Sequence, residues 1–239
     1  MLTQHHRTIS LIGEENHNLI SSKKVMIIGL GAVGGYALEC LARIGIKNLI
    51  VVDFDTFEPS NLNRQILATH STLNTQKSIS AQNRILDINP SSTPLALDIK
   101  LTPHNLDFIT FHQPDFVIDA IDDTSAKTSL IEFLITHNIP FISALGAALK
   151  YNPEQLTTTT LDKTSSCPLA KKLRTNLRSK NLPLNQINVT YSKEPSQISK
   201  DNNGNNVLGS LPFVPMSMGA SLAFFAFQTL INNGEKNEK

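Results

Sequence analysis

Residues 24–35, KVMIIGLGAVGG, decide the fold of this chain. The apolar run at Lys24–Ile28 predicts a short buried strand, and the residues after Gly35 predict a helix that continues to Ile44. Between them lies a loop with the spacing Gly-x-Gly-x-x-Gly: Gly29, Gly31 and Gly34. Glycines permit the tight turn from strand to helix and a close approach of a ligand to the backbone, while the helix N-terminus offers free N–H groups to phosphate. The stretch therefore predicts a phosphate-binding loop.

An acidic residue follows this loop at the spacing that nucleotide-binding folds use. Residues 48–53, NLIVVD, predict a second strand, and Asp53 lies nineteen residues after Gly34. An acid at this place accepts hydrogen bonds from ribose hydroxyls. Strand, glycine loop and acid together predict nucleotide binding, but they do not distinguish ATP from the dinucleotide of a dehydrogenase.

Strands and helices continue to alternate through the first 150 residues. Further strands are predicted at residues 93–99, 116–121 and 141–145, and further helices at residues 77–86 and 129–137. This alternation predicts an α/β fold with a doubly wound, Rossmann-like, mostly parallel sheet, which binds ligands outside the carboxyl ends of its strands.

The character of the chain changes after Lys150. A polar, β-leaning segment at 157–164 leads into a basic segment, a turn-rich loop at 201–206 and a core helix predicted over Gly219–Ile231. We expect one domain over residues 1–239. Its nucleotide-binding half would be residues 1–150, and its polar and basic crossover half, which takes the substrate, residues 151–239.

Two cations follow Asp53 along the chain. The segment DFDTFEPSNLNRQ at 53–65 ends in Arg64 and Gln65, and Lys77 lies thirteen residues after Arg64. Because the glycine loop largely satisfies the two phosphates of a nicotinamide cofactor, two more cations beside it favour a triphosphate. The residues alone leave open that both are ordinary solvated side chains.

Three carboxylates end the strand predicted at 116–121, within VIDAIDDT: Asp119, Asp122 and Asp123. A carboxylate at the carboxyl end of a strand can hold Mg²⁺ together with phosphate oxygens, whereas hydride transfer needs no acid there. We assign Asp122 to the metal, while Asp115 and Asp119 can instead cap or turn the chain.

The order GLGAVGG, DFD, SNLNRQ, a lysine and D-x-x-D resembles the ubiquitin-activating-type family of adenylating enzymes, which includes ThiF and MoeB. The resemblance covers residues 7 to about 146 and implies adenylation of a carboxylate with ATP and Mg²⁺. By position it implies catalytic roles for Arg64, Lys77 and Asp122, with Asp122 on the metal side. The nucleotide-binding residues that it implies are Gly29, Gly31, Gly34, Asp53, Asp55, Asn61, Arg64, Gln65 and Lys77.

The family also supplies an arginine from the partner subunit, in an R-Q-x-x-L-x-G motif near the N-terminus. Residues 7–13, RTISLIG, match this motif at Arg7, Leu11 and Gly13, and Thr8 replaces the glutamine. The match implies a homodimer in which Arg7 acts at the partner's catalytic site. The alternative is a solvated arginine near the chain terminus.

A basic segment, KTSSCPLAKKLRTNLRSK, occupies residues 163–180. Leu169, Leu173 and Leu177 form one helical stripe, and the basic side chains lie largely off it: Lys171, Lys172, Arg174, Arg178 and Lys180. The basic face is either simply solvated, or it contacts the phosphates of RNA or an anionic membrane.

A closer resemblance joins this segment to VTYSKEP at 189–195 and LGSLPFVP at 208–215. Together they resemble the tRNA threonylcarbamoyladenosine dehydratases, bacterial members of the same family, over nearly the whole chain. The resemblance implies that ATP activates the free carboxylate of threonylcarbamoyladenosine beside the tRNA anticodon. A nitrogen of the same side chain then closes a ring and expels AMP, with net loss of water. The basic helix would bind the tRNA.

Two other functions stay open at this stage. One is an adenylyltransferase that activates the C-terminal Gly-Gly carboxylate of a small sulfur-carrier protein, and the other is a non-catalytic nucleotide-binding scaffold. A sulfur-transfer partner such as a cysteine desulfurase, and a monovalent cation (Na⁺ or K⁺) near Gly146, are further options.

The cysteines argue against zinc and disulfides. The chain has two, Cys40 and Cys167, too few for a four-ligand zinc site or a disulfide framework. We therefore predict no zinc and a reducing, cytoplasmic location. Cys167 precedes Pro168 as a helix cap, and a catalytic thiol would need an activating neighbour that the sequence does not identify.

An uncharged stretch raises the question of a membrane. Net charge is +1, so any basic patch is local, but residues 211–233 carry no charge at all. Pro212 and Pro215 are expected to break the start of this stretch, which favours a core helix. Membrane association through residues 211–231 is the alternative.

Overall fold

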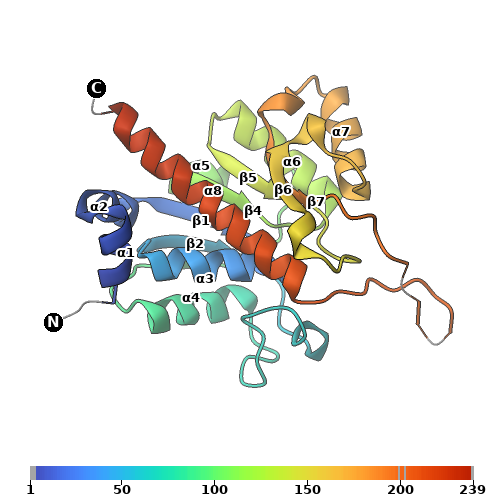
Figure 1. The fold of residues 1–239 in the computed structure, drawn as a ribbon, viewed down its shortest axis with the longest axis horizontal. Coiled ribbons are helices and arrows are strands. Elements are labelled where there is room, and N and C mark those ends of the chain that lie inside the picture. The colour runs from blue at the N-terminus through green and yellow to red at the C-terminus, as the bar shows by residue number, and fades with distance from the viewer. Residues whose placement is uncertain (1–3, 199, 202, 238–239) are drawn as a thin grey trace.

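A seven-stranded sheet forms the centre of the computed structural model, which describes residues 4–198, 200, 201 and 203–237 (Figure 1). The strand order is β3-β2-β1-β4-β5-β7-β6, and neighbours are parallel except that β6 runs antiparallel to β7. The strands are β1 (Lys24–Ile28), β2 (Asn48–Val52), β3 (Leu95–Leu97), β4 (Phe116–Asp119), β5 (Phe141–Ala144), β6 (Leu156–Thr160) and β7 (Asn188–Ser192). The predicted doubly wound, mostly parallel sheet is confirmed.

Helices cover both faces of the sheet. They are α1 (His6–Ile12), α2 (Glu14–Ser22), α3 (Gly34–Ile44), α4 (Lys77–Ile88), α5 (Asp107–His112), α6 (Thr124–Thr136), α7 (Pro168–Ser179) and α8 (Phe213–Asn237). Val25 and Ile27 of β1 pack in the core cluster shared with α3, α4 and α8, whereas Met26 and Ile28 pack in the cluster shared with α5 and α6. The unbroken apolar run of β1 is what a parallel strand covered on both faces requires.

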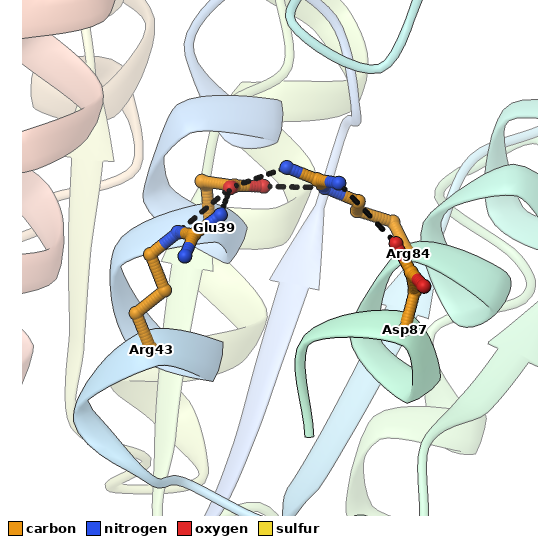
Figure 2. A network of polar contacts seen from close by, with 4 residues as sticks. All are labelled: Glu39, Arg43, Arg84 and Asp87. Atoms are coloured by element: carbon orange, nitrogen blue, oxygen red, sulfur yellow. Dashed lines mark hydrogen bonds and ion pairs between the residues drawn. The ribbon is translucent and has the colours of Figure 1, made fainter. Parts of the chain in front are cut away.

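An ion-pair network joins α3 to α4, as Figure 2 shows. Glu39 of α3 accepts hydrogen bonds from Nε and Nη2 of Arg84 on α4 at 2.9 and 2.8 Å, and from Nε of Arg43 at 2.8 Å. Burial alone would raise the pKa of Glu39, but the hydrogen bonds from Arg84 and Arg43 outweigh it and lower that pKa. Both helices begin at the carboxyl edge of the sheet, so the network fixes the glycine loop relative to Lys77.

The C-terminal helix α8 crosses one face of the sheet diagonally (Figure 1). Its side chains Met218, Leu222 and Ala226 are buried in the main core cluster. The predicted core helix is confirmed, but its predicted start at Gly219 is wrong, since α8 begins at Phe213. Pro215 lies in the first turn, where the backbone N–H has no intrahelical partner, so a proline there does not break the helix.

Part of α8 also has the length and composition of a membrane span. This part is Phe213–Asn232, and 44% of its most apolar window is buried inside the protein. One such helix is weak evidence for a membrane, because the core helix of a globular protein has the same length and apolarity.

The start of one helix and the presence of one strand also differ from prediction. Helix α6 begins at Thr124 rather than Ser129, because Asp123 accepts the N–H of Ala126 at 2.7 Å as its N-cap. The polar segment after Lys150 forms β6 and pairs with β7, a strand that the sequence did not reveal. Both strands extend the same sheet, so residues from the second half of the chain lie beside the first.

Candidate active site

A cleft of about 740 Å³ opens beyond the carboxyl ends of β1, β2 and β4, where the strand order reverses. Sheets of this type bind ligands at such a point. Its walls come from the glycine loop, the segment after β2, the loops after β3, β4 and β5, and residues 208–215. The site residues predicted from sequence that line it are Gly29, Gly31, Asp53, Asp55, Arg64, Gln65, Lys77 and Asp122. The predicted residues Gly34 and Asn61 are buried and do not line the cleft.

The three glycines of the loop differ in why a side chain could not replace them. Gly29 has a φ of +91°, and a Cβ there would lie 2.7 Å from the carbonyl oxygen of Ala120. At Gly34 a Cβ would lie 1.8 Å from the carbonyl oxygen of Gly29. The fold itself therefore requires these two. At Gly31 a Cβ would meet only Nε2 of Gln65, at 3.8 Å, so the open space over Gly31 fits a phosphate close to the backbone.

Asp53 is held at the cleft by backbone hydrogen bonds. Its Oδ2 accepts the N–H of Leu30 at 2.6 Å, and its Oδ1 accepts the N–H of Asp55 at 2.9 Å. Burial raises the pKa of Asp53 above its ordinary value, although these hydrogen bonds oppose the rise. Each carboxylate oxygen keeps a second lone pair, which can accept a ribose hydroxyl.

Arg64 and Lys77 bring positive charge to the same cleft. Lys77, the first residue of α4, is 6% exposed, and its Nζ lies 3.2 Å from Oδ2 of Asp55. Nη1 of the half-buried Arg64 donates to the carbonyl oxygen of Ser60 at 2.8 Å and to Oδ1 of Asn63 at 2.9 Å. Both cations are thus positioned by their neighbours, and each keeps further N–H groups for anionic oxygens.

The two amides predicted to contact the nucleotide lie in different settings. Oδ1 of Asn61 accepts the N–H of Glu58 at 3.2 Å and so closes a short 3₁₀ helix, η1 (Pro59–Asn61). Gln65 is 7% exposed and lines the cleft, and its Oε1 has no hydrogen-bond partner within the described part of the chain. A buried acceptor without a partner is uncommon, and a bound ligand or water would satisfy it.

A buried charge cluster, Asp119–Lys127–Ser143, fixes the loop between β4 and α6. All three residues are 0% exposed. Nζ of Lys127 donates to Oδ2 of Asp119 at 2.6 Å and to Oγ of Ser143 at 3.0 Å, while Oγ of Ser143 donates to Oδ2 of Asp119 at 2.5 Å. Oδ1 of Asp119 accepts the N–H of Ile121 at 3.1 Å. Burial lowers the pKa of Lys127 more than the negative charge of Asp119 raises it.

The loop held by this cluster presents Asp122 to the cleft. Asp122 is exposed and, among the described residues, makes no hydrogen bond or ion pair, whereas Asp123 caps α6. Within the same residues there is no group of three or more His, Cys, Asp or Glu side chains that could hold a metal ion. A single free carboxylate fits Mg²⁺, which commonly takes one or two carboxylates and completes its shell with phosphate oxygens and water.

Other residues of the cleft escaped the sequence analysis. Ile99, Lys100 and Leu101 follow the carboxyl end of β3, so the rule for parallel sheets could have found them. Nζ of Lys100 lies 5.0 Å from the ring centroid of Phe54, which also lines the cleft. Ser210 comes from the far end of the chain, within the segment LGSLPFVP that carries part of the family resemblance, but the resemblance gave it no site role.

The sequence pattern that defines the ThiF family matches residues 3–239. The chain belongs to the ThiF family. It is 35% identical over 202 residues to the tRNA threonylcarbamoyladenosine dehydratase of Bacillus subtilis, covering 84% of this chain and 79% of that protein. It is 36% identical over 172 residues to the enzyme of the same name from Escherichia coli, covering 72% of this chain and 64% of the relative.

Solved structures agree with these relatives. Two crystal structures of E. coli tRNA N6-threonylcarbamoyladenosine dehydratase, one in complex with AMP and one with ATP, match with TM-scores of 0.90. Sequence identities are 28% and 27%, and each match covers 99% of both chains. ThiF-family membership also bears on two further regions, Arg7 and the basic helix α7.

Arg7 is exposed on α1, at the opposite end of α3 from the cleft. A Cβ at Gly45, which ends α3, would lie 3.3 Å from the ring of His5 and 2.7 Å from that of His17, so α1 and α2 pack at this end. A helix of eleven residues is about 16 Å long, and α3 begins in the glycine loop. Arg7 therefore lies away from the cleft of its own chain.

Helix α7 starts at the cleft and runs away from it. Leu169, in its first turn, lines the cleft, and the predicted stripe buries Leu173 and Leu177 against α6 and β7. The five predicted tRNA-binding side chains divide into two groups. Three are exposed and form no ion pair with any described residue: Lys171, Lys172 and Arg178. The other two, Arg174 and Lys180, make contacts within the protein. Nη1 of Arg174 donates to the carbonyl oxygen of Thr164 at 2.9 Å, and Lys180 pairs with Glu132 at 2.7 Å.

Cys167 stands just before α7 and is 7% exposed. A Cβ at Gly146, in the cleft wall, would lie 3.7 Å from its Sγ. The thiol therefore packs behind the cleft wall as the N-cap residue, and the hydrophobic cluster of α7 includes it.

Proposed function

We propose that the protein catalyses the ATP-dependent dehydration, by cyclisation, of threonylcarbamoyladenosine beside the anticodon of tRNA. The observation that carries this proposal is the cleft itself. It joins a glycine loop, a ribose-binding acid, two positioned cations and a free carboxylate in a chain that matches an ATP-bound dehydratase along 99% of its length.

The roles of the residues follow from charge and position. The glycine loop and the N-terminus of α3 would bind phosphate, and Asp53 would bind the ribose. Arg64 and Lys77 would hold the negative charge that grows on the phosphates when the substrate carboxylate attacks the α-phosphorus and pyrophosphate leaves. Because both cations are already held by Ser60, Asn63 and Asp55, little reorganisation is needed at that step.

Asp122 would hold Mg²⁺ beside the phosphates. The ion would neutralise negative charge on the phosphates and hold the α-phosphate in position for attack on its phosphorus. Asp119 and Lys127 would act through Asp122 by fixing its loop, and they would not touch the reacting atoms.

The second step needs no nucleophile from the protein. A nitrogen of the threonylcarbamoyl group attacks its own activated carbonyl carbon, AMP carries away the carboxylate oxygen, and a ring remains. Because this attack is intramolecular, binding the side chain in a bent conformation can supply most of the acceleration. This agrees with the placement of Cys167 behind the cleft wall.

We further propose a homodimer in which Arg7 reaches the cleft of the partner subunit. Its exposure on α1, at the far end of α3 from its own cleft, supports a contact across an interface. We propose that the exposed side chains Lys171, Lys172 and Arg178 bind tRNA phosphates, and that the enzyme is cytoplasmic. A monovalent cation near Gly146 and a sulfur-transfer partner stay predictions.

The test is to incubate the purified protein with ATP, Mg²⁺ and tRNA carrying threonylcarbamoyladenosine, and to measure the mass of the nucleoside. We expect an ATP-dependent loss of one water, which Asp122→Asn abolishes while ATP binding persists. No mass change, together with ATP–pyrophosphate exchange that appears only with a Gly-Gly carrier protein, would replace this function by carrier activation.

A further inference from the structure

A second, smaller cavity of about 190 Å³ adjoins the nucleotide cleft. It is bounded by two stretches of chain, Leu149–Tyr151 and Gly209–Leu211, and by Gln197. Ser210 lines both cavities, and Ala147 and Ala148, which precede Leu149, line the larger one. The two cavities therefore share a wall at Ser210, which we call the seam.

The walls of this smaller cavity are held in place by the segment that follows β7. The N–H of Leu149 donates to the carbonyl oxygen of Gly209 at 2.9 Å, and the N–H of Gln197 donates to the carbonyl oxygen of Leu149 at 2.9 Å. The carboxylate of Glu194 accepts the N–H of Tyr151 at 3.0 Å, and Lys150 donates to the carbonyl oxygen of Glu194. Leu149 has a φ of +61°, a conformation that residues other than glycine seldom adopt and that these hydrogen bonds hold.

An exposed aromatic side chain, Tyr151, lines this cavity and contributes little to the buried core. Tyr151 is 61% exposed, although its backbone is fixed by Glu194. Leu149 and Leu211 contribute apolar side chains to the lining of the cavity, beside the polar residues Lys150, Gln197 and Ser210. Enzymes that act on a base within RNA extrude it into a pocket and hold it by stacking on aromatic and apolar side chains.

We infer that this smaller cavity holds the modified adenine base of the substrate, with Tyr151 as its stacking partner. The inference rests on the proposed function and supplies the base-binding site that this function lacks. The threonylcarbamoyl group links the exocyclic nitrogen of the adenine to the reacting carboxylate through a short chain of covalent bonds. The base must therefore lie directly beside the nucleotide cleft, and the seam at Ser210 satisfies this requirement. The cavity is too small for a second nucleotide with its phosphates, but it suits a single purine base.

The chain offers a clean optical test because it contains no tryptophan. In Tyr151→Trp the new indole is the only one, and we expect its emission to be quenched saturably by an anticodon stem-loop RNA carrying threonylcarbamoyladenosine. The matched control is Phe111→Trp. Phe111 is 81% exposed near the end of α5. The carbonyl oxygen of the next residue, His112, accepts a hydrogen bond from Nζ of Lys24 at the start of β1, so Phe111 lies near the amino ends of the strands, away from the cleft. Equal quenching in both variants, or none in Tyr151→Trp while the RNA is bound, would overturn the inference.

Kinetics give a second measurement. Tyr151→Ala should raise the KM for modified tRNA about tenfold to a hundredfold, as expected for loss of one base–aromatic stack, and leave the KM for ATP unchanged. Tyr151→Phe, which keeps the stack, should behave like the wild type. An unchanged KM for tRNA in Tyr151→Ala would refute the base site.

The two failures are distinguishable. Saturable quenching in Tyr151→Trp without any dehydration by the wild type would keep the base site and reject the reaction. Dehydration by the wild type without quenching would keep the reaction and reject the site.

Discussion

Replacing Lys127 with methionine tests the buried charge cluster behind the cleft. Methionine nearly preserves the volume of the lysine side chain, so packing is largely maintained while the positive charge disappears. Within the part of the chain that the structure describes, Asp119 is then left with two donors, Oγ of Ser143 at 2.5 Å and the N–H of Ile121 at 3.1 Å, and its side chain is 0% exposed. Breaking a buried ion pair by removing one partner costs about 3–5 kcal/mol.

Because two donors remain for Asp119, we expect the loss in free energy of unfolding to be at the lower end of this range, about 3 kcal/mol. For a chain of this size, that loss lowers the melting temperature by about 6–12 °C. Circular dichroism during heating measures the change.

A double variant supplies the control. Lys127→Met combined with Asp119→Asn leaves no uncompensated charge, so it should recover much of the stability that Lys127→Met loses. The reasoning would be refuted if Lys127→Met melted within 2 °C of the wild type, or if the double variant were no more stable than the single one.

Three further changes test other parts of the molecule. Glu39→Gln should lower the free energy of unfolding at pH 7 by about 2 kcal/mol, since it weakens charged hydrogen bonds. Urea titration should show this difference shrinking as the pH falls below the ordinary glutamate pKa of 4.5 and vanishing only below the lowered pKa of Glu39 in the folded protein, where the wild type loses the same ion pairs. Gly219→Ala puts a Cβ 2.5 Å from the carbonyl oxygen of Val33, so it should lower the free energy of unfolding by about 1–3 kcal/mol and weaken ATP binding. Stability and ATP affinity are compared with those of Ala220→Ser, a change on the exposed side of the same helix. A stable Gly219→Ala variant with normal ATP affinity would contradict this. Mixing subunits of Arg7→Ala and Asp122→Asn, each inactive alone, should restore about a quarter of wild-type activity, because half of the sites in mixed dimers are intact; no recovery would exclude action in trans.

The central strands were predictable because burial on both faces leaves little choice of sequence. The runs at β1 and β2 read as strands almost to the residue, and the spacing from Gly34 to Asp53 located the nucleotide edge. Helix starts were less certain, since they depend on a single contact. The cap at Asp123 and the tolerance of Pro215 in a first turn both displaced the predicted boundaries.

The site was predictable only where one stretch of chain supplies it. Arg64, Lys77 and Asp122 each follow a motif, and all line the cleft. The partners of Asp119 were not predictable, because Lys127 looks like an ordinary helix lysine and Ser143 like an ordinary strand residue until the fold brings them together. The wall around Ser210 depends on a crossover that no periodicity encodes.

The last part of the cleft wall to be synthesised is the stretch 208–215, which leads into α8. During translation, the glycine loop and the Asp122 loop emerge long before this stretch leaves the ribosome. A nascent chain therefore has its phosphate loop exposed with one side missing, and α8 has yet to press on α3 at Gly219. Closure of the cleft is therefore a late event in the folding of the polypeptide, because residues 208–215 and α8 follow every other part of its wall in the sequence.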